Sequence, residues 1–215
     1  MGKLTIKQIL ETLESQLRYG KSYLEIARGL RDAEPIVTGV AYTFFGLMQE
    51  SGFFMAQMCL ARLYDKHRGT VTISLLLEQA SKHPDAFQSG TLVTREVDIA
   101  RGRVSGLAPV LAAITHRRDT WFAHIDPRAV NNPTAHQAKA ELTIDQLQDA
   151  FSETESIIQK FGNLLDGTIG PVRFMGGDDY KHLFKLIRQS HSSELERFDR
   201  AFEAQFGHPP PKKKV

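Results

Sequence analysis

The chain has 215 residues, of which 41% are hydrophobic and 24% are charged, as in an ordinary globular protein. This length suits one domain, or one domain with an extra helical arm. A net charge of +2 permits an anionic partner without requiring one, and the single Cys59 excludes an internal disulfide or a four-cysteine zinc site. The most apolar stretch, 36–48, is shorter than the roughly 20 residues of a membrane span, and residues 1–16 lack a signal-peptide core. We therefore expect a soluble, cytoplasmic protein without membrane contact.

The first helix is predicted from its cap and its apolar spacing. Thr5 and Gln8 form a capping box, which satisfies free backbone N–H groups at a helix start. Gly20 interrupts the apolar stripe that follows, so residues 22–30 either continue the helix or form a separate one. The stripe consists of Ile6, Ile9, Leu10, Leu13 and Leu17.

Two strongly apolar segments come next. Pro35 suits the first turn of a helix that runs to Met48. The second segment runs from Phe53 to Tyr64. Because both segments are apolar nearly all round, we expect both to lie in the core.

The middle of the chain predicts three further helices. A short one begins at Thr72 and ends before Pro84. Residues 91–125 form two more, because glycines weaken the middle of this stretch. The second of these begins near Ser105, with Pro109 in its first turn.

The strongest periodic signal follows a second capping box, formed by Thr143 and Gln146. Its apolar residues recur at three- and four-residue steps, with Thr154 as the one polar member. They are Ile144, Leu147, Phe151, Ile158, Phe161 and Leu165. After a turn-rich break, Asp178 or Asp179 caps a last helix.

No segment shows the sustained two-residue alternation of a strand, so the pattern predicts an all-α fold with about seven helices. We expect a helical bundle over 1–166 and a C-terminal helical extension packed on it over 167–207. Residues 208–215 are expected to form a disordered basic tail, which contains Lys212–Lys214.

The stretch 116–126 holds two arginines, two histidines, two acidic residues and the only tryptophan. Arginine can hold two phosphate oxygens in a fork, and histidine can transfer a proton near neutral pH. Arg118 and His124, oriented by Asp119, therefore suggest cleavage of RNA by its own 2′-hydroxyl, for which no metal is needed. The structural alternative is a helix end where Arg118 and His124 satisfy the last carbonyls.

Helix geometry separates the two proposed catalytic residues. Residues six apart lie about 120° apart around a helix axis and roughly 9 Å along it. Arg118 and His124 thus do not share a face of one straight helix, whereas Arg117 is closer to the face of His124. Either the helix distorts near its end, or two copies assemble the site across a two-fold axis.

Arg62 and Asp65, at i and i+3 on a predicted helix, have two interpretations of equal weight. They form a salt bridge at the edge of the core, or they support the wall of a catalytic cleft. Trp121 and Phe122 favour core or dimer-interface positions over base stacking.

Established phosphate-loop, dinucleotide and zinc-protease motifs are absent from the sequence. The eight histidines never fall at i and i+4 with a third ligand nearby. We therefore predict neither a metal site nor a cofactor.

Residues 118–124 resemble the signature of the HEPN (higher eukaryotes and prokaryotes nucleotide-binding) superfamily, which is an Arg, a polar residue, a short spacer and a His late in a helical bundle. Similarity at 60–65, 72–75 and 123–126 indicates the AbiU-like abortive-infection branch, over about residues 5–165. The resemblance implies an antiparallel HEPN-like bundle, to which the C-terminal helix is an addition.

The resemblance also implies a function. RNA-cleaving HEPN proteins are metal-independent endoribonucleases that dimerise to form one composite cleft. Arg118 would bind the scissile phosphate, His124 would act in acid–base catalysis, and Asp119 would tune them, with Arg117, Arg62 and Asp65 in support. We expect a homodimeric ribonuclease in phage defence or a toxin role, with RNA and a possible neutralising protein as partners. The alternative is a non-catalytic HEPN module that binds RNA, a nucleotide or a protein.

Overall fold

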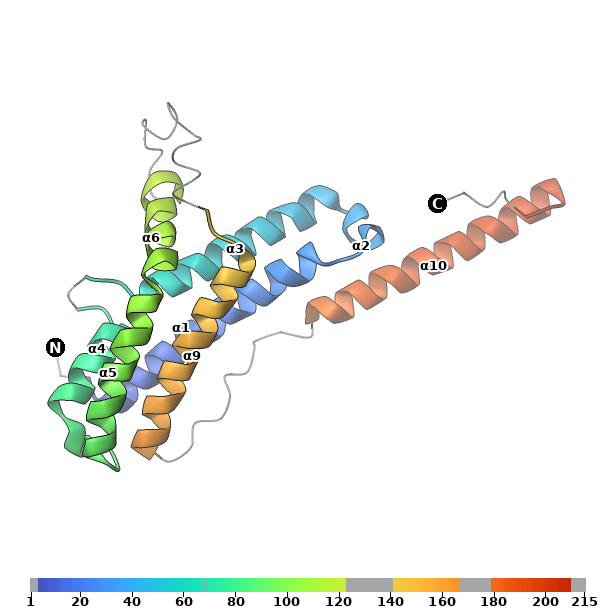
Figure 1. Ribbon diagram of the computed structural model, residues 1–215. Helices are drawn as coiled ribbons and strands as arrows, with labels where there is room; N and C mark the ends of the chain where they lie inside the picture. The colour runs from blue at the N-terminus through green and yellow to red at the C-terminus, as the bar shows by residue number, and fades with distance from the viewer. Residues whose placement is uncertain (1–3, 68, 123–140, 167–178, 210–215) are drawn as a thin grey trace.

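The computed structural model describes residues 4–67, 69–122, 141–166 and 179–209. Within these ranges every regular element is helical, which confirms the all-α prediction. None of the described helices combines the length and apolar character needed to cross a bilayer. The elements in chain order are α1 (Ile6–Arg31), α2 (Pro35–Gly39), α3 (Tyr42–Leu63), α4 (Ile73–Lys82), η1 (Pro84–Ala86), α5 (Gly90–Gly106), α6 (Ala108–Arg117), η2 (Arg118–Phe122), α9 (Ile144–Asp166) and α10 (Asp179–Phe206) (Figure 1).

The predicted helix starts are confirmed by their hydrogen bonds. Thr5 and Gln8 form the capping box of α1, and Thr143 and Gln146 make the corresponding backbone–side-chain bonds before α9. The Thr72 hydroxyl accepts the N–H of Leu75 at the start of α4. These caps satisfy backbone donors that have no partner within the helix.

Helix α1 lies at the centre of the bundle and packs against both α3 and α9 (Figure 1). Helix α9 runs antiparallel to α1, because contacts further along α1 involve earlier residues of α9. Lys21 pairs with Glu155. About two turns further along α1, the guanidinium of Arg28 donates a hydrogen bond to the side-chain oxygen of Gln148 at 2.9 Å. The side chains of Lys21 and Glu155 are each only 17% exposed, so this ion pair lies at the edge of the core.

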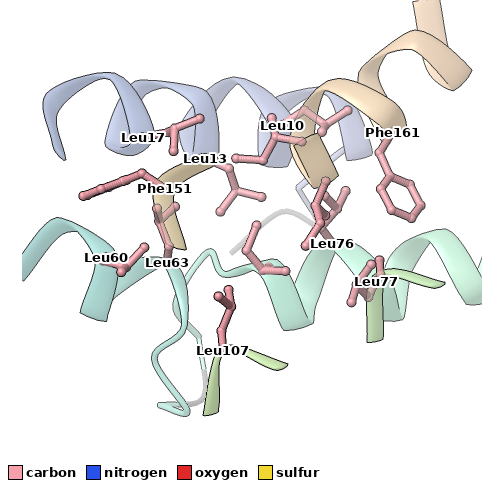
Figure 2. Close-up of a cluster of buried hydrophobic side chains, with 14 of the residues drawn as sticks. Leu10, Leu13, Leu17, Leu60, Leu63, Leu76, Leu77, Leu107, Phe151 and Phe161 are labelled. Carbon is pink, nitrogen blue, oxygen red and sulfur yellow. The ribbon is translucent and has the colours of Figure 1, made fainter. Parts of the chain in front are cut away.

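The main core forms where α1, α3, α4, α5 and α9 meet. The stripes predicted for α1 and α9 face one another there, together with side chains from the end of α3 and from α4 (Figure 2). The largest side chains with under 2% exposure include Leu13, Leu17, Leu60, Leu63, Leu76, Ile114, Phe151 and Phe161. Burial of such residues is the main stabilising contribution to the fold.

Thr154, the polar member of the α9 stripe, is fully buried but has its hydrogen bonds satisfied. Its hydroxyl donates to the carbonyl of Ala150 and therefore accepts from the hydroxyl of Tyr64, at 2.8 Å. This bond ties the end of α3 to the middle of α9. A buried hydroxyl without such partners would be destabilising.

Gly20, which suggested a helix break, and Gly52 are both contact points within continuous helices. A Cβ at Gly20 would lie 2.5 Å from the Phe151 ring and 2.9 Å from Cβ of Cys59. A Cβ at Gly52 would lie 2.9 Å from the carbonyl oxygen of Tyr23. Gly20 therefore does not interrupt α1, and α3 passes through Gly52 without a break.

The prediction that both apolar segments lie in the core is only partly right for the first segment, of which Val37 and Phe45 are buried in a second cluster. This segment forms the short α2 and the first half of α3, where Phe44, Leu47 and Met48 are 56%, 59% and 41% exposed. The second segment does contribute Leu60 and Leu63 to the main core. Apolar composition alone could not distinguish a covered helix from one that extends past its neighbours.

Helix α10 contacts the bundle through its first turns. Tyr180 packs against Gly29 of α1, and its hydroxyl donates to Glu25 at 2.9 Å. Phe184 packs with Phe45 at 6.3 Å between ring centroids, in a second apolar cluster. The other buried members of that cluster are Leu30 and Val37. The remainder of α10 projects away from the other helices (Figure 1). The division of the chain at residues 166 and 207 stays a prediction.

Candidate functional site

The candidate motif begins where the helix geometry changes. Helix α6 ends at Arg117, and Arg118–Phe122 continue as a turn of π-helix, η2. The hydroxyl of the buried Thr120 donates to the carbonyl of His116, four residues earlier. Such side-chain bonding competes with the α-helical pattern, and π-turns are frequent at functional sites. The helix geometry thus changes at Arg118, and because His124 lies outside the described residues, both predicted alternatives for its position relative to Arg118 stay predictions.

Arg118 and Asp119 form an ion pair at this turn. Nε of Arg118 lies 2.7 Å from Oδ1 of Asp119, and the two side chains are 39% and 58% exposed. The hydrogen bond from Asp119 raises the pKa of Arg118, and the charge of Asp65 adds to this effect. The guanidinium is thus fully charged, accessible and held in one orientation.

These residues line a groove with a volume of about 690 Å³, which we call the Arg118 groove. Its charged and polar wall includes Asp65, His116, Arg118 and Asp119. An apolar wall comes from Ala61, Val104, Ala108, Leu111 and Ala112. A groove of this size with convergent polar groups on an apolar surface is typical of a ligand site.

Asp65 reaches the groove from a different part of the chain. It lies after Tyr64, the C-cap of α3, and its Oδ1 accepts the N–H of His67 at 3.1 Å. The expectation that Arg62 and Asp65 occupy one helix is therefore wrong. Both residues are described, and no ion pair joins them; Arg62 is exposed and Asp65 half-buried. Of the two, Asp65 lines the groove with Arg118.

Arg117 is directed toward α3 rather than into the groove. Its guanidinium carbon lies 5.3 Å from the centroid of the Phe53 ring, within cation–π range. Burial lowers its pKa. Arg117 therefore connects α6 to α3, while its neighbour Arg118 faces the groove.

His124 lies outside the described residues, as do the side chains of Trp121 and Phe122. The groove does contain His116, which was present in the motif but was not selected from the sequence. Its position was nonetheless predictable in outline. Residues 108, 111, 112, 115 and 119 follow one helical face, and His116 adjoins that face.

Acidic, histidine and cysteine side chains do not gather into a possible metal site anywhere in the part of the chain that the structure describes. The groove chemistry that the described residues offer is that of one guanidinium, the ammonium of Lys66, two carboxylates and one imidazole, with the hydroxyls of Tyr64 and Thr115. The guanidinium can bind an anionic oxygen, and the imidazole can donate or accept a hydrogen bond.

Comparison with known proteins identifies the family. The model of the HEPN family AbiU2 matches residues 5–186, from the start of α1 into the first turns of α10. The match extends further than the resemblance at 5–165 indicated. No curated protein and no solved structure gives a match. Because the family model covers most of the chain, the protein belongs to the AbiU2 family of HEPN proteins.

Proposed function

We propose that this protein is a metal-independent endoribonuclease with a role in abortive infection of phage-infected cells or as a toxin. The observation that carries the proposal is the charged, oriented Arg118 on the wall of a groove, six residues before His124. Membership of the AbiU2 family supports the abortive-infection role. Two copies would combine their grooves into one composite cleft.

The proposed reaction uses the RNA's own nucleophile. The 2′-oxygen of a ribose attacks the adjacent phosphorus, and the bond from phosphorus to the 5′-oxygen of the next nucleotide breaks. One His124 accepts the proton of the 2′-hydroxyl, and the His124 of the second copy donates a proton to the leaving 5′-oxygen. The products are a 2′,3′-cyclic phosphate and a free 5′-hydroxyl.

Arg118 would stabilise the charge that develops on the non-bridging phosphate oxygens. Asp119 would hold the guanidinium in place through the 2.7 Å bond already present. When phosphate binds, one side of the guanidinium fork stays on Asp119 while the other faces the substrate.

The two carboxylates beside Arg118 favour a second candidate function. Asp119 bonds to the guanidinium and Asp65 adds negative charge to the same wall, so both oppose an incoming phosphate. A non-catalytic module that binds RNA, a nucleotide or a partner protein through the groove would be consistent with this charge balance. Because Lys66 also lines the groove, two basic and two acidic side chains balance there, and a neutralising protein with charges of both signs would fit it.

The test is cleavage of total RNA in EDTA by the native protein and by His124→Ala. The proposal predicts cleavage with cyclic-phosphate ends for the native protein and none for the variant. Equal cleavage by both proteins would reject His124 as the catalytic group. Binding of RNA without cleavage by either would support the non-catalytic module.

A further inference from the structure

Helix α10 carries a largely apolar stripe. At 3.6 residues per turn, Phe184, Ile187, Leu195, Phe198 and Phe202 fall within a sector of roughly 80°. His191 occupies the same sector between Ile187 and Leu195, so the stripe has an apolar part in the turns that touch the bundle and another toward the far end of the helix. We call its last three members the distal stripe.

The two halves of this stripe differ in their surroundings. Phe184 is buried in the second cluster, beside Ile187. Residues 192–201 are all exposed, with Leu195 at 49% and Phe198 at 58%. Phe198 and Phe202 stack at 6.0 Å between ring centroids and form a small aromatic ridge. An amphipathic stripe of this kind normally faces a partner surface.

A partly apolar groove, whose lining also includes Arg31, Gln49 and Glu50, lies at the junction of α2 and α3. This groove of about 420 Å³ opens beside the second cluster, and Tyr42 and Leu47, 78% and 59% exposed, form part of its wall. Leu30 and Phe45 belong both to this groove and to the second cluster. The groove is therefore continuous with the surface on which α10 already packs.

We propose that a second copy of this chain covers both surfaces. The distal stripe of each copy would lie in the α2–α3 groove of the other, with the two α10 helices antiparallel across a two-fold axis. One symmetry operation would then bury the ridge and the groove of both copies at once.

The charges of α10 are complementary in this arrangement. Residues 179–192 contain three basic side chains and one acidic side chain, whereas residues 193–206 contain two basic and four acidic ones. An antiparallel pair places each net positive half beside the net negative half of the other copy. This favours the antiparallel register over a parallel one.

The exposed apolar area comes close to that of a standard interface. The exposed side chains concerned are Tyr42 and Leu47 on the groove and Leu195 and Phe198 on the distal stripe. At roughly 100 Å² of exposed surface each, they offer on the order of 400 Å² per copy. A standard interface buries about 800 Å² per partner, of which a little over half is apolar.

The test compares two substitutions on opposite faces of α10 in the full chain. Leu195→Asp changes the distal stripe, while Leu186→Asp changes a leucine of nearly equal exposure, 48%, on the opposite face. We expect Leu195→Asp to halve the mass measured by light scattering at the concentration where the native protein is associated. Leu186→Asp should leave that mass unchanged. The RNA-cleaving site lies about 30 Å away along α3, so if it also pairs two copies, the native assembly holds more than two copies and Leu195→Asp should reduce it to the pair made at that site.

A crosslink identifies the occupant of the groove. Phe198→Cys and Leu47→Cys proteins, mixed and oxidised, should form a disulfide between the two different chains, since the native Cys59 is buried. The proposal is overturned if the native protein is monomeric at every concentration, if both aspartate variants keep the native mass, or if no mixed disulfide forms.

Discussion

Tyr64 and Asp65 are neighbours in the chain, but one belongs to the core and the other to the Arg118 groove. The Tyr64 hydroxyl is bonded to a fully buried threonine, and burial raises its pKa to about 12. The Asp65 carboxylate is half-buried and acts on Arg118. The comparison shows that the Tyr64 hydroxyl already has its partner in the core, whereas the side chains of the groove can still bind a ligand. Substitutions in the two regions should therefore separate stability from function.

The largest effect on stability is expected from Phe151→Ala. Phe151 is 1% exposed and lies between α1 and α9, so its loss leaves a cavity in the main core. The free energy of unfolding should fall by about 3–5 kcal/mol, measured by urea denaturation. Phe44→Ala, at a site that is 56% exposed, is the control and should change it by less than about 1 kcal/mol. Similar losses at the two sites would contradict the assigned core.

A smaller loss is expected from Gly20→Ala. The added methyl group would lie 2.5 Å from the Phe151 ring, so helix packing must shift, at a cost of about 1–3 kcal/mol. Gly102→Ala in α5 is the matched control, because no atom lies within 4 Å of its added Cβ. That substitution should instead stabilise the protein by about 0.5–1 kcal/mol. Thermal unfolding of both variants would show whether the two substitutions change the stability in opposite directions.

Tyr64→Phe should change the pH dependence of stability. The pKa of Tyr64 is about 12 in the folded protein, and the value for an unfolded chain is about 10. The folded state therefore keeps the hydroxyl proton up to a higher pH than the unfolded chain does. The stability that this difference contributes is fully present below about pH 10 and is lost as the pH rises to 12. The native protein should lose on the order of 2 kcal/mol more than the variant over this interval. If chemical denaturation shows that the free energy of unfolding falls equally with pH in the native protein and the variant, the hydroxyl is not buried.

The smallest effect is expected from Arg62→Ala. Arg62 is exposed and makes no ion pair with Asp65, so the free energy of unfolding should change by less than about 0.5 kcal/mol. RNA cleavage should also change little, because Arg62 does not line the Arg118 groove. A large loss of cleavage in an RNA digestion assay would contradict this and show that Arg62 belongs to the RNA-cleaving site.

Local sequence patterns predicted the helices and the candidate motif, because caps and apolar periodicity act over a few residues. The starts at Thr5, Thr72 and Thr143 and the stripe facing Phe151 are of this kind. Contacts between distant segments were not predictable in this way. The fit of Gly20 against Phe151 depends on a residue 131 positions later.

The same limit explains the misassigned residues. In the first half of α3, Phe45 is covered by Phe184 of α10, whereas Phe44 and Leu47 are exposed, although the composition resembles that of a core helix. Asp65 acts on Arg118 because α3 ends at Leu63, which changes the direction of its side chain relative to Arg62. The π-turn at Arg118 gave no periodic signal of its own in so short a segment.

The most direct test of this account measures cleavage and stability on the same preparation of Arg118→Ala. The Arg118–Asp119 pair is exposed, so its loss should change the free energy of unfolding by less than about 1 kcal/mol. Cleavage of RNA in EDTA should fall by about 10²–10³-fold, as expected for loss of a group that stabilises developing charge. Native stability with lost cleavage would support a groove that serves function rather than folding. Unchanged cleavage, or loss of both cleavage and stability, would contradict it.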